Sequence, residues 1–599
     1  PRYLAFVTGN RYEPLLQMAY SNAQNIYAHF FSGRELFNWY ALDERHVLMA
    51  LHRLNRFNFA AVDSDIVGTI YSTYISREEK RHKGQYYTPV PIVQTILDQV
   101  GYSGAAVINR RLIDPACGSG SFLVAAAKRL VNTYQAQAVD DPATVLERVR
   151  NALFGFDLNP FACYLAEVNL LIQVLDLVKA AEVLGQRQPI ERFHIYNIDA
   201  LSQPSGTFPI GSTLLAAENQ IVEQIKARAE GSVFANGFHF AVANPPYGAT
   251  LSETYKATLR TDWPTVFYGQ PDTYTFFMAL GVRLLADGGR LGYITPNTFL
   301  MGSSNTAALR RELAAALVIE QLVDLPQGIW RDANVDCVLL FGRRERAEPI
   351  RRAHTVTVHT LALADSLAAL TDRRWRETLT HPQATWMDDP EARFNLRYDD
   401  LMRRIEAACT VATNGKPEIL RLEDVTEINR GVEPYHSREQ GKSAIFIKPK
   451  NQLASNENHW KPLLDSNSQI GRYSLTWHSS KPHLNYGSWL YRAYQSKYYE
   501  LPKLLFIRLR NRSLKRRLVA TYDEQKFYNR HNYTNIIAKY SNYNLKYILA
   551  LFNSTLLNFW YNRQFANVEI SIDNVRRLPI YPADSATQAE LVGLVDQLL

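Results

Sequence analysis

This sequence has little cysteine and no long hydrophobic run. Its four cysteines (Cys117, Cys163, Cys337 and Cys409) are scattered and include no CxxC pair, so neither a disulfide framework nor a zinc site is expected. No stretch of about 18 uncharged apolar residues occurs, so the sequence indicates no membrane-spanning helix. The chain starts at Pro1 and shows no signal peptide. We therefore expect a protein of the reducing cytoplasm, and whether a further segment precedes Pro1 is left open.

The composition is that of a large globular protein with a basic region. A chain of 599 residues with 46 % hydrophobic and 21 % charged residues is expected to form about three domains. Its net charge is +8 and its pI is near 9.0, which indicates a polyanionic partner. The surplus is local, because residues 481–563 hold 15 Lys and Arg against 3 Asp and Glu. This segment belongs to a Tyr-rich and Asn-rich region, so a domain boundary is predicted near 411–417.

Hydrophobic spacing predicts helices over residues 1–80 and an alternating α/β region from about residue 108. Strands are predicted at 109–115, 152–160, 192–201, 238–247, 290–296, 318–326 and 335–344, and helices at 122–134, 161–177 and 272–289. This alternation is typical of a doubly wound α/β sheet, whose ligands bind beyond the carboxyl ends of the strands. Residues 345–415 give no interpretable pattern.

Four predicted strands in succession end at a polar side chain. Asp114, Asp157 and Asp199 end the first three, and Asn244 ends the fourth. An acid at the second position can accept both hydroxyls of a ribose, and Asp199 can accept a hydrogen bond from an adenine amino group. One such acid alone is typical of a turn or helix cap. Three acids at successive strand ends favour a nucleoside site.

The turn after the first strand contains Gly118 and Gly120 within LIDPACGSGSFL, residues 112–123. Glycine has no Cβ, so a ligand can approach the backbone closely. The spacing is not GxGxxG, which disfavours a nicotinamide cofactor.

The fourth strand ends in HFAVANPPYGAT, residues 239–250. Pro245 and Pro246 have no N–H and fix φ near about −65°, so the strand cannot continue and the chain enters a stiff extended turn. Tyr247 follows them. Two prolines after an asparagine are, by themselves, typical of a loop, so the surrounding motifs decide the interpretation.

The order GQYYTP (84–89), DPACGSG (114–120), GFDLNP (155–160), NIDAL (197–201) and NPPYG (244–248) resembles the gamma class of DNA adenine amino-methyltransferases, which use S-adenosyl-L-methionine. It is most similar to methylases of type II and type IIG restriction-modification systems and related phage-defence enzymes. INRGVEPY (428–435) and LALFNSTLLNFWY (549–561) resemble the C-terminal specificity domain of that class.

The resemblance covers nearly the whole chain and implies its organisation. It implies a helical N-terminal connector at 1–80, a doubly wound Rossmann-like methyltransferase domain at 81–410, and a mixed α+β target-recognition domain at 411–599. The expected enzyme is prokaryotic and cytoplasmic, acts on double-stranded DNA, and belongs to a restriction or defence system with possible partner subunits.

The resemblance also implies the site residues. The catalytic set is Asn244, Pro245, Pro246 and Tyr247. The cofactor set is Thr88, Asp114, Ala116, Gly118, Gly120, Asp157, Leu158, Asp199 and Ala200, with Leu158 and Ala200 beside the adenine of the cofactor. A second aromatic ring for the target base is either Trp330 or Phe341, and the spacing does not decide between them. No metal ion is expected.

Methylation of an exocyclic amine explains the NPPY turn. Such an amine is a poor nucleophile because its lone pair is delocalised into the ring. If the Asn244 side-chain oxygen and the Pro245 carbonyl accept its N–H bonds, the nitrogen becomes more tetrahedral and attacks the sulfonium methyl group. Tyr247 supplies a ring for a base that must leave the duplex to reach the site. The sequence lacks a Pro-Cys catalytic pair, which disfavours carbon-5 methylation of cytosine.

The segment FIRLRNRSLKRRL, residues 506–518, alternates basic and apolar residues among tyrosines. This pattern predicts contacts with DNA phosphates. The residues expected to make them are Arg508, Arg510, Arg512, Lys515, Arg516 and Arg517.

Three other functions fit parts of the sequence. Methylases of RNA or of protein amides share NPPY, but the long basic C-terminal region favours DNA. Asp65, Glu78 and Lys80 include the E-x-K spacing of a magnesium-dependent nuclease, but their segment is predicted to be helical. If the protein cuts DNA, a nuclease domain upstream of Pro1, as in type IIG enzymes, is a better explanation than these three residues. A catalytically idle scaffold is disfavoured by the intact NPPY.

Overall fold

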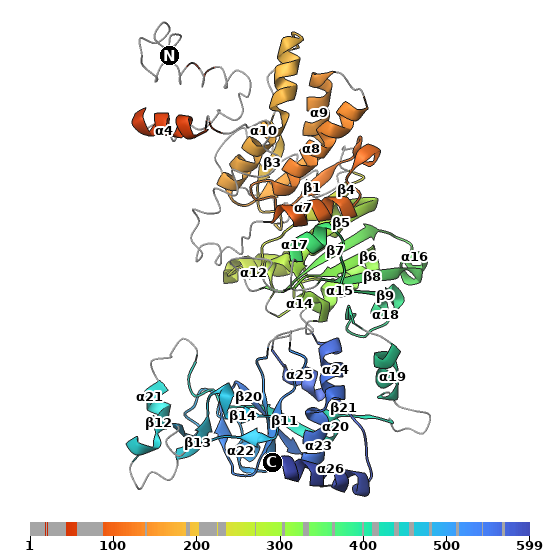
Figure 1. Ribbon diagram of the computed structural model, residues 1–599. Helices are drawn as coiled ribbons and strands as arrows, with labels where there is room; N and C mark the ends of the chain where they lie inside the picture. The colour runs from red at the N-terminus through yellow and green to blue at the C-terminus, as the bar shows by residue number, and fades with distance from the viewer. Residues whose placement is uncertain are drawn as a thin grey trace. The chain divides into compact units, whose positions relative to one another are not determined.

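The chain folds as two compact units, Pro1–Leu396 and Arg397–Leu599 (Figure 1). Each is described by itself and is called the N-terminal or the C-terminal unit. In this computed structural model the described residues are 44–54, 88–137, 141–186, 192–202, 235–269, 271–301, 306–326, 335–361, 366–397, 400–409, 418–436, 443–453, 460–477, 482–510, 514–541, 543–565 and 569–599, with Met18, Ser21, Arg56 and Ile225. Of the helices expected over 1–80, α4 (Glu44–Leu54) lies within these residues.

A nine-stranded mixed sheet forms the centre of the N-terminal unit, with the strand order β3-β2-β1-β4-β5-β7-β6-β8-β9. The strands are β1 (Leu112–Asp114), β2 (Leu153–Asp157), β3 (His194–Asn197), β4 (Phe238–Ala243), β5 (Leu285–Pro296), β6 (Leu317–Asp324), β7 (Cys337–Arg344), β8 (Thr355–Thr360) and β9 (Glu377–Pro382). Strands β3, β2, β1, β4 and β5 are parallel, and β7 is antiparallel to β5 and β6.

Twelve helices follow α4 in the described part of this unit. They are α7 (Val90–Gln99), η3 (Gly104–Val107), α8 (Ser121–Ala136), α9 (Pro142–Ala152), α10 (Pro160–Val183), α12 (Glu253–Asp262), α13 (Thr273–Leu284), α14 (Thr298–Met301), α15 (Ala307–Ala316), α16 (Glu348–Ala353), α17 (Ser366–Thr371) and α18 (Gln383–Met387).

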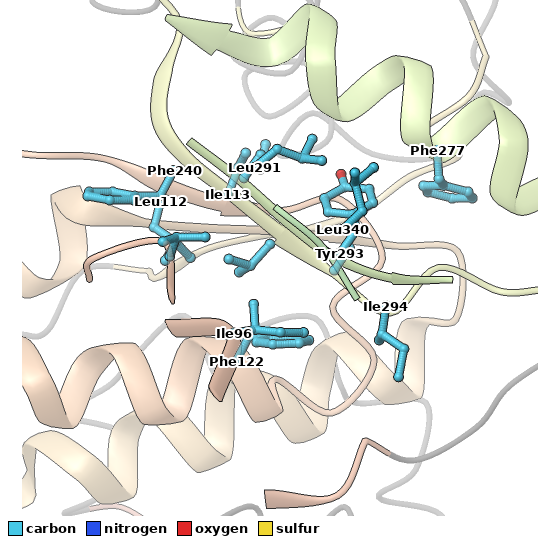
Figure 2. Packing of buried hydrophobic residues seen from close by; sticks show 14 of the residues in the cluster. Ile96, Leu112, Ile113, Phe122, Phe240, Phe277, Leu291, Tyr293, Ile294 and Leu340 are labelled. Atoms are coloured by element: carbon cyan, nitrogen blue, oxygen red, sulfur yellow. The ribbon is translucent and has the colours of Figure 1, made fainter. Parts of the chain in front are cut away.

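Helices cover both faces of the sheet and bury the apolar side chains of its central strands, such as β1 and β4. Figure 2 shows Ile96 of α7 and Phe122 of α8 on one side of the strands and Phe277 of α13 on the other. Leu112 and Leu291, on strands between them, are inaccessible to solvent. Burial of this continuous apolar layer fixes the strand register and therefore the positions of the strand ends.

The order of the strands brings four predicted polar strand ends to one edge. β1 lies between β2 and β4, and all are parallel, so their carboxyl ends point the same way. The chain runs outward from β1 through β2 to β3 and then returns to place β4 on the other side of β1. A crevice at such a reversal is where open α/β sheets bind ligands.

Helix α10 is, among the described helices, the one long and apolar enough to cross a membrane by length and composition. It packs against α8, α9 and β3 and buries Leu165, Ala166 and Leu170 in the core of the unit. Its apolar character is therefore used for packing inside the protein.

One expectation about this unit was wrong in detail. The helix predicted over 272–289 ends at Leu284, and its last residues belong to β5. A Cβ on Gly289 would lie 2.7 Å from the Phe238 carbonyl oxygen, so the glycines permit close pairing with β4 instead of closing a helix. The segment from 345, which gave no pattern, supplies β8 and β9 at the sheet edge.

In its described residues the C-terminal unit is a mixed α/β structure with two four-stranded sheets, ordered β11-β20-β17-β18 and β12-β16-β13-β19, and two strand pairs, β10-β21 and β14-β15. Its strands are β10 (Leu420–Arg421), β11 (Thr426–Arg430), β12 (Ile447–Pro449), β13 (Trp460–Leu464), β14 (Ile470–Gly471), β15 (Ser474–Leu475), β16 (Pro482–Asn485), β17 (Lys503–Ile507), β18 (Ala520–Asp523), β19 (Tyr528–Asn529), β20 (Tyr533–Ala538) and β21 (Pro579–Ile580). Its helices are α19 (Asp400–Ala408), α20 (Leu422–Val425), α21 (Ser443–Phe446), η6 (Lys450–Gln452), η7 (Asn467–Gln469), α22 (Lys497–Glu500), α23 (Leu545–Phe552), α24 (Thr555–Gln564), α25 (Ile572–Arg576) and α26 (Ser585–Leu598).

Candidate active site

The turn after β1 contains two glycines with positive φ angles. Gly118 and Gly120 have φ angles of 55° and 89°, a backbone conformation that other residues rarely adopt. A Cβ added to Gly118 would meet no atom within 4 Å, whereas one on Gly120 would lie 3.1 Å from the Ala166 Cβ of α10. Gly118 therefore leaves space beside the backbone, and Gly120 permits α8 to pack closely against α10. Ala116, in the same turn, is half-buried.

Two side chains from α10 and β2 fix this turn. The Gly118 N–H donates to Asp157 Oδ2 over 2.9 Å, and the buried Asn169 donates from Nδ2 to the Ser119 carbonyl oxygen over 3.0 Å. Asp114, the last residue of β1, accepts a bond of 3.0 Å from the Ala116 N–H. Three hydrogen bonds with side chains therefore restrain the turn.

Asp157 is the last residue of β2, and the sequence after it starts a helix at once. Its Oδ1 accepts a bond of 2.8 Å from the Asn159 N–H, and Asn159 in turn accepts one from the Phe161 N–H at the start of α10. Pro160 occupies the first helical position, where its missing N–H costs nothing. Leu158, the residue directly after Asp157, is 71 % exposed. Its apolar side chain is therefore accessible to solvent next to the Asp157 carboxylate.

Burial dominates the electrostatics of the two carboxylates. Burial raises the pKa of Asp114 to about 8, with a smaller contribution from the negative charge of Asp157. Burial also raises the pKa of Asp157, against the opposing hydrogen bonds from Asn159 and Gly118. Hydrogen-bond donors or a positive charge on a ligand would favour the ionised forms of both.

The carboxylate after the third strand accepts a hydrogen bond from a tyrosine that the sequence analysis did not identify. Asp199, just after β3, accepts on Oδ1 from the Leu201 N–H over 2.9 Å and from the Tyr255 hydroxyl of α12 over 3.0 Å. Ala200 is buried in the core. Helix α12 is held near this strand end, because the Trp263 indole N–H donates to the Leu201 carbonyl oxygen over 2.8 Å.

The NPPY turn follows β4 and contacts the start of α7. Asn244 donates from Nδ2 to the Thr88 hydroxyl over 3.1 Å, which joins two motifs that are 156 positions apart. This bond sets the orientation of the amide, so Oδ1 is its acceptor end. Pro245 is buried and Pro246 is half-buried. Tyr247 is only 3 % exposed, so a base can stack on it only if the ring becomes accessible when DNA binds.

The start of α13 also contacts this turn, and sequence reasoning missed it. The Thr273 hydroxyl donates to the Pro246 carbonyl oxygen over 2.6 Å, and the Gly248 N–H donates to both carboxylate oxygens of Asp272, over 3.0 and 3.1 Å. The sequence shows Asp272 and Thr273 at the start of a predicted helix, but it does not show that they contact the NPPY turn.

Two sets of predicted residues remain: the second aromatic ring for the target base and the three residues with nuclease spacing. Phe341 lies within β7 and is 2 % exposed, so, as for Tyr247, its ring would have to become accessible before a base could stack on it. Trp330 lies outside the described residues. Asp65, Glu78 and Lys80 also lie outside them. Within the described ranges, no group of three His, Cys, Asp or Glu side chains is arranged to hold a metal ion.

The basic run of the C-terminal unit divides into buried and exposed residues, which corrects the predicted set. Arg508 is buried, donates to the His531 carbonyl oxygen over 2.7 Å and pairs with Glu569. Arg517 is 1 % exposed and donates to the Phe565 carbonyl oxygen over 2.6 Å. These two guanidinium groups stabilise the unit from inside and are not placed to reach phosphates.

The other members of the run differ in exposure. Lys515 and Arg516 are exposed, and the half-buried Arg510 donates to the Arg516 carbonyl oxygen over 3.1 Å. Arg512 lies outside the described residues. The exposed charge of the run is therefore concentrated at Lys515 and Arg516.

Comparison with known proteins gives two family matches and several distant relatives. The chain is similar to the type II restriction enzyme and methyltransferase RM.Eco57I of Escherichia coli, with 22 % identity over 337 residues that cover 48 % of this chain and 32 % of the relative. It is also similar to the adenine-specific methyltransferase PglX of Streptomyces coelicolor, with 26 % identity over 347 residues that cover 53 % of this chain and 28 % of the relative. The chain thus spans about a third of the length of these relatives.

The solved structures that share the fold include two restriction-modification enzymes bound to DNA. The ATP-dependent type ISP restriction-modification enzyme LlaBIII bound to DNA has a TM-score of 0.57 and 13 % identity, covering 90 % of this chain and 41 % of that one. The type IIL restriction-modification enzyme MmeI in complex with DNA has a TM-score of 0.56 and 12 % identity, covering 89 % of this chain and 73 % of that one.

Each of the two family matches lies within one of the two units. The TaqI-like C-terminal specificity domain matches residues 461–580, within the C-terminal unit. The N-6 DNA Methylase family matches residues 62–373, more than half of the 599 residues. The chain therefore belongs to the N-6 DNA Methylase family and carries a methyltransferase domain followed by a TaqI-like C-terminal specificity domain.

Proposed function

We propose that this chain transfers the methyl group of S-adenosyl-L-methionine to N6 of an adenine flipped out of duplex DNA. The observation that carries the proposal is that the NPPY turn, the glycine turn and the Asp157 carboxylate lie at the carboxyl ends of three adjacent parallel strands, β4, β1 and β2, where the strand order reverses. The chain would act in the bacterial cytoplasm as part of a restriction-modification or phage-defence system. Other subunits of that system would be its protein partners.

The domain assignment follows from the same observations. The doubly wound, Rossmann-like part of the sheet, β3-β2-β1-β4-β5, would be the catalytic domain of residues 81–410, preceded by the connector of residues 1–80. The region from 411 would be the target-recognition domain. The compact division falls after Leu396, so α19 belongs to the C-terminal unit, where its Met402 packs in the core.

The residues at the strand ends fit S-adenosyl-L-methionine. Gly118 leaves open space beside the backbone, Leu158 presents an exposed apolar face for a ring, and Asp157 is a carboxylate suited to two ribose hydroxyls. The raised pKa of Asp114 suits a neighbouring cationic group, which would favour ionisation. Thr88, Ala116, Gly120, Asp199 and Ala200 complete the proposed cofactor set.

When bound, the cofactor supplies an electrophilic methyl group on a sulfonium centre. The chain's own contribution is to hold the target amine. Asn244 Oδ1 and the Pro245 carbonyl oxygen accept its two N–H bonds, which localises the nitrogen lone pair. Because the prolines are stiff and Thr88 holds the Asn244 amide, these acceptors are oriented before the reaction, and preorganised dipoles of this kind are a large source of rate enhancement. Tyr247 is proposed to stack on the base.

Incubation with radiolabelled S-adenosyl-L-methionine and duplex DNA, followed by nucleoside analysis, tests this function. We expect label in N6-methyladenine. Label in cytosine, RNA or a protein amide in place of adenine would refute the proposal.

A prediction about DNA affinity concerns Lys515 and Arg516. Replacing both by alanine is expected to weaken binding to cognate and unrelated duplexes alike and to lower the slope of log affinity against log salt by about 2, because each phosphate contact contributes about 0.9. Binding measured over a salt series checks this.

The matched control replaces Lys526 and Lys539, two exposed lysines elsewhere in the C-terminal unit. It removes the same charge and is expected to leave the slope nearly unchanged. An equal change in both pairs would show a general charge effect and contradict a local contact at Lys515 and Arg516. Arg508 and Arg517 are excluded because their loss would leave buried carbonyl groups without donors.

A second candidate function is the methylase part of a bifunctional type IIG restriction enzyme. The observation that favours it is the similarity to RM.Eco57I, described as both a restriction enzyme and a methyltransferase, of which this chain spans 32 %. Incubation of the full natural protein with supercoiled plasmid and magnesium distinguishes the two, because specific linear products require a nuclease.

A further inference from the structure

The NPPY turn cannot be held by a strand ladder. Pro245 and Pro246 have no N–H, and β4 ends at Ala243, so the backbone of the turn lacks two of the donors that would otherwise fix it. Gly248, which follows Tyr247, has a φ of 71°. A catalytic turn of this kind needs other groups to set its position.

Helix α13 supplies those groups from its first residues. The Thr273 hydroxyl donates to the Pro246 carbonyl oxygen over 2.6 Å. The Gly248 N–H donates to Oδ1 and Oδ2 of Asp272 over 3.0 and 3.1 Å. One acceptor and one donor of the turn, on either side of Tyr247, are thus held by two adjacent side chains.

The helix that carries this pair is itself rigid. Nearly every residue of α13 is buried, and the helix packs against β4 and β5. Thr275 reinforces its first turn, because its hydroxyl donates to the Asp272 carbonyl oxygen over 2.7 Å. Tyr274, between them, hydrogen-bonds the Thr298 hydroxyl over 3.1 Å. The pair therefore has a fixed platform from which to orient the turn.

The other end of the turn is held independently. Asn244 donates to Thr88 over 3.1 Å, which sets the side-chain amide. That bond cannot set the Pro245 carbonyl, because it acts on a side chain and the Pro245-Pro246 backbone lies beyond it. The α13 pair acts on the backbone on the far side of the two prolines.

We propose that Asp272 and Thr273 are positioning residues for methyl transfer, which hold the backbone of the NPPY turn so that the Pro245 carbonyl oxygen and Asn244 face the target amine together. This rests on the proposed function. The role is one of orientation, since neither side chain needs to touch the base or the cofactor. A displacement of about 1 Å in such a turn can slow a reaction on the order of 10²-fold.

Amide exchange tests the contact itself, whether or not the chain methylates DNA. The segment 244–248 has no exchangeable amide at either proline, so its signal comes from Asn244, Tyr247 and Gly248. Millisecond hydrogen exchange should be faster at Gly248 in Asp272→Ala than in the unaltered protein. Unchanged exchange at Gly248 would overturn the proposed contact.

Single-turnover methyl transfer tests the catalytic consequence. Thr273→Val is expected to slow transfer on the order of tenfold, and Asp272→Ala on the order of 10²-fold, with cofactor and DNA affinities within about twofold of the unaltered protein. Thr273→Ser, which keeps the hydroxyl, should restore the rate. Unchanged transfer in Asp272→Ala, or failure of Thr273→Ser to exceed Thr273→Val, would overturn the proposal.

Asp141 and Thr144, at the start of α9, are a control for Asp272 and Thr273. They form a comparable interaction at a helix start. Asp141 accepts from the Thr144 N–H over 3.1 Å and from the Thr144 hydroxyl. Asp141→Ala and Thr144→Val should lower thermal stability without changing the transfer rate. If the unaltered protein transfers no methyl group at all, the proposed function fails, and the exchange experiment still decides the Asp272 contact.

Discussion

Replacing Asn244 by alanine is expected to slow methyl transfer to adenine N6 on the order of 10²–10³-fold, because the target amine loses an oriented acceptor where charge develops. Cofactor and DNA affinities should remain, because the buried strand β4 keeps the backbone before the turn in place without the Asn244 side chain. Single-turnover transfer together with separate binding measurements checks both parts.

Asn151→Ala is a matched control, because Asn151 is exposed at the end of α9. It should leave the rate unchanged. Thr88→Val, which removes the hydroxyl that accepts from the Asn244 amide, should give an intermediate loss. Parallel loss of DNA binding, cofactor binding and transfer in Asn244→Ala would indicate a structural role and contradict the catalytic assignment.

Replacing Asp157 by alanine is expected to weaken cofactor binding on the order of 100-fold, which corresponds to the loss of hydrogen bonds to a charged acceptor. Asp157 also accepts from the Gly118 N–H, so the substitution removes both the proposed ribose acceptor and one restraint on the glycine turn. DNA affinity without cofactor should be unaffected. Calorimetric titration with S-adenosyl-L-methionine measures the change.

Asp157→Asn separates these two roles. It keeps a side-chain oxygen that can accept from Gly118 but cannot accept as strongly from two hydroxyls, so an intermediate affinity is expected. Asp176→Ala, an exposed acid on α10, is the control of equal charge. Cofactor affinity unaltered in Asp157→Ala would show that another group holds the ribose.

The strand ends of the catalytic region could be predicted because local sequence determines them. Asp114, Asp157 and Ala243 end their strands where a glycine turn, an Asn-Pro helix start and two prolines follow. Each of these signals acts within a few residues, so a single sequence contains it. The order of the strands then brings the ends together.

The contacts between distant segments could not be predicted in the same way. The hydroxyl that holds Asn244 comes from Thr88, 156 positions earlier, and the Gly248 N–H is held by Asp272 of a later helix. A threonine or aspartate at a helix start satisfies local capping rules wherever it occurs. Only the packing of α7 and α13 on the sheet selects these partners.

The basic run shows the limit of a charge pattern. Alternating basic and apolar residues did not indicate that Arg508 and Arg517 would be buried, because their partners, the His531 and Phe565 carbonyl oxygens, lie far along the chain. A buried arginine with carbonyl partners has the same sequence signature as one that faces solvent. The exposure of Lys515 and Arg516 had to come from the structure.

Sequencing with detection of modified bases, on DNA from cells that express this chain, tests the proposed function most directly. The Asn244→Ala protein, expressed at the same level, is the control. We predict N6-methyladenine within one recurring sequence in cells with the unaltered chain, and its absence in cells with the variant. Modified cytosine, unmodified DNA, or the same adenine modification with the variant would contradict the assignment of adenine methylation to the NPPY turn.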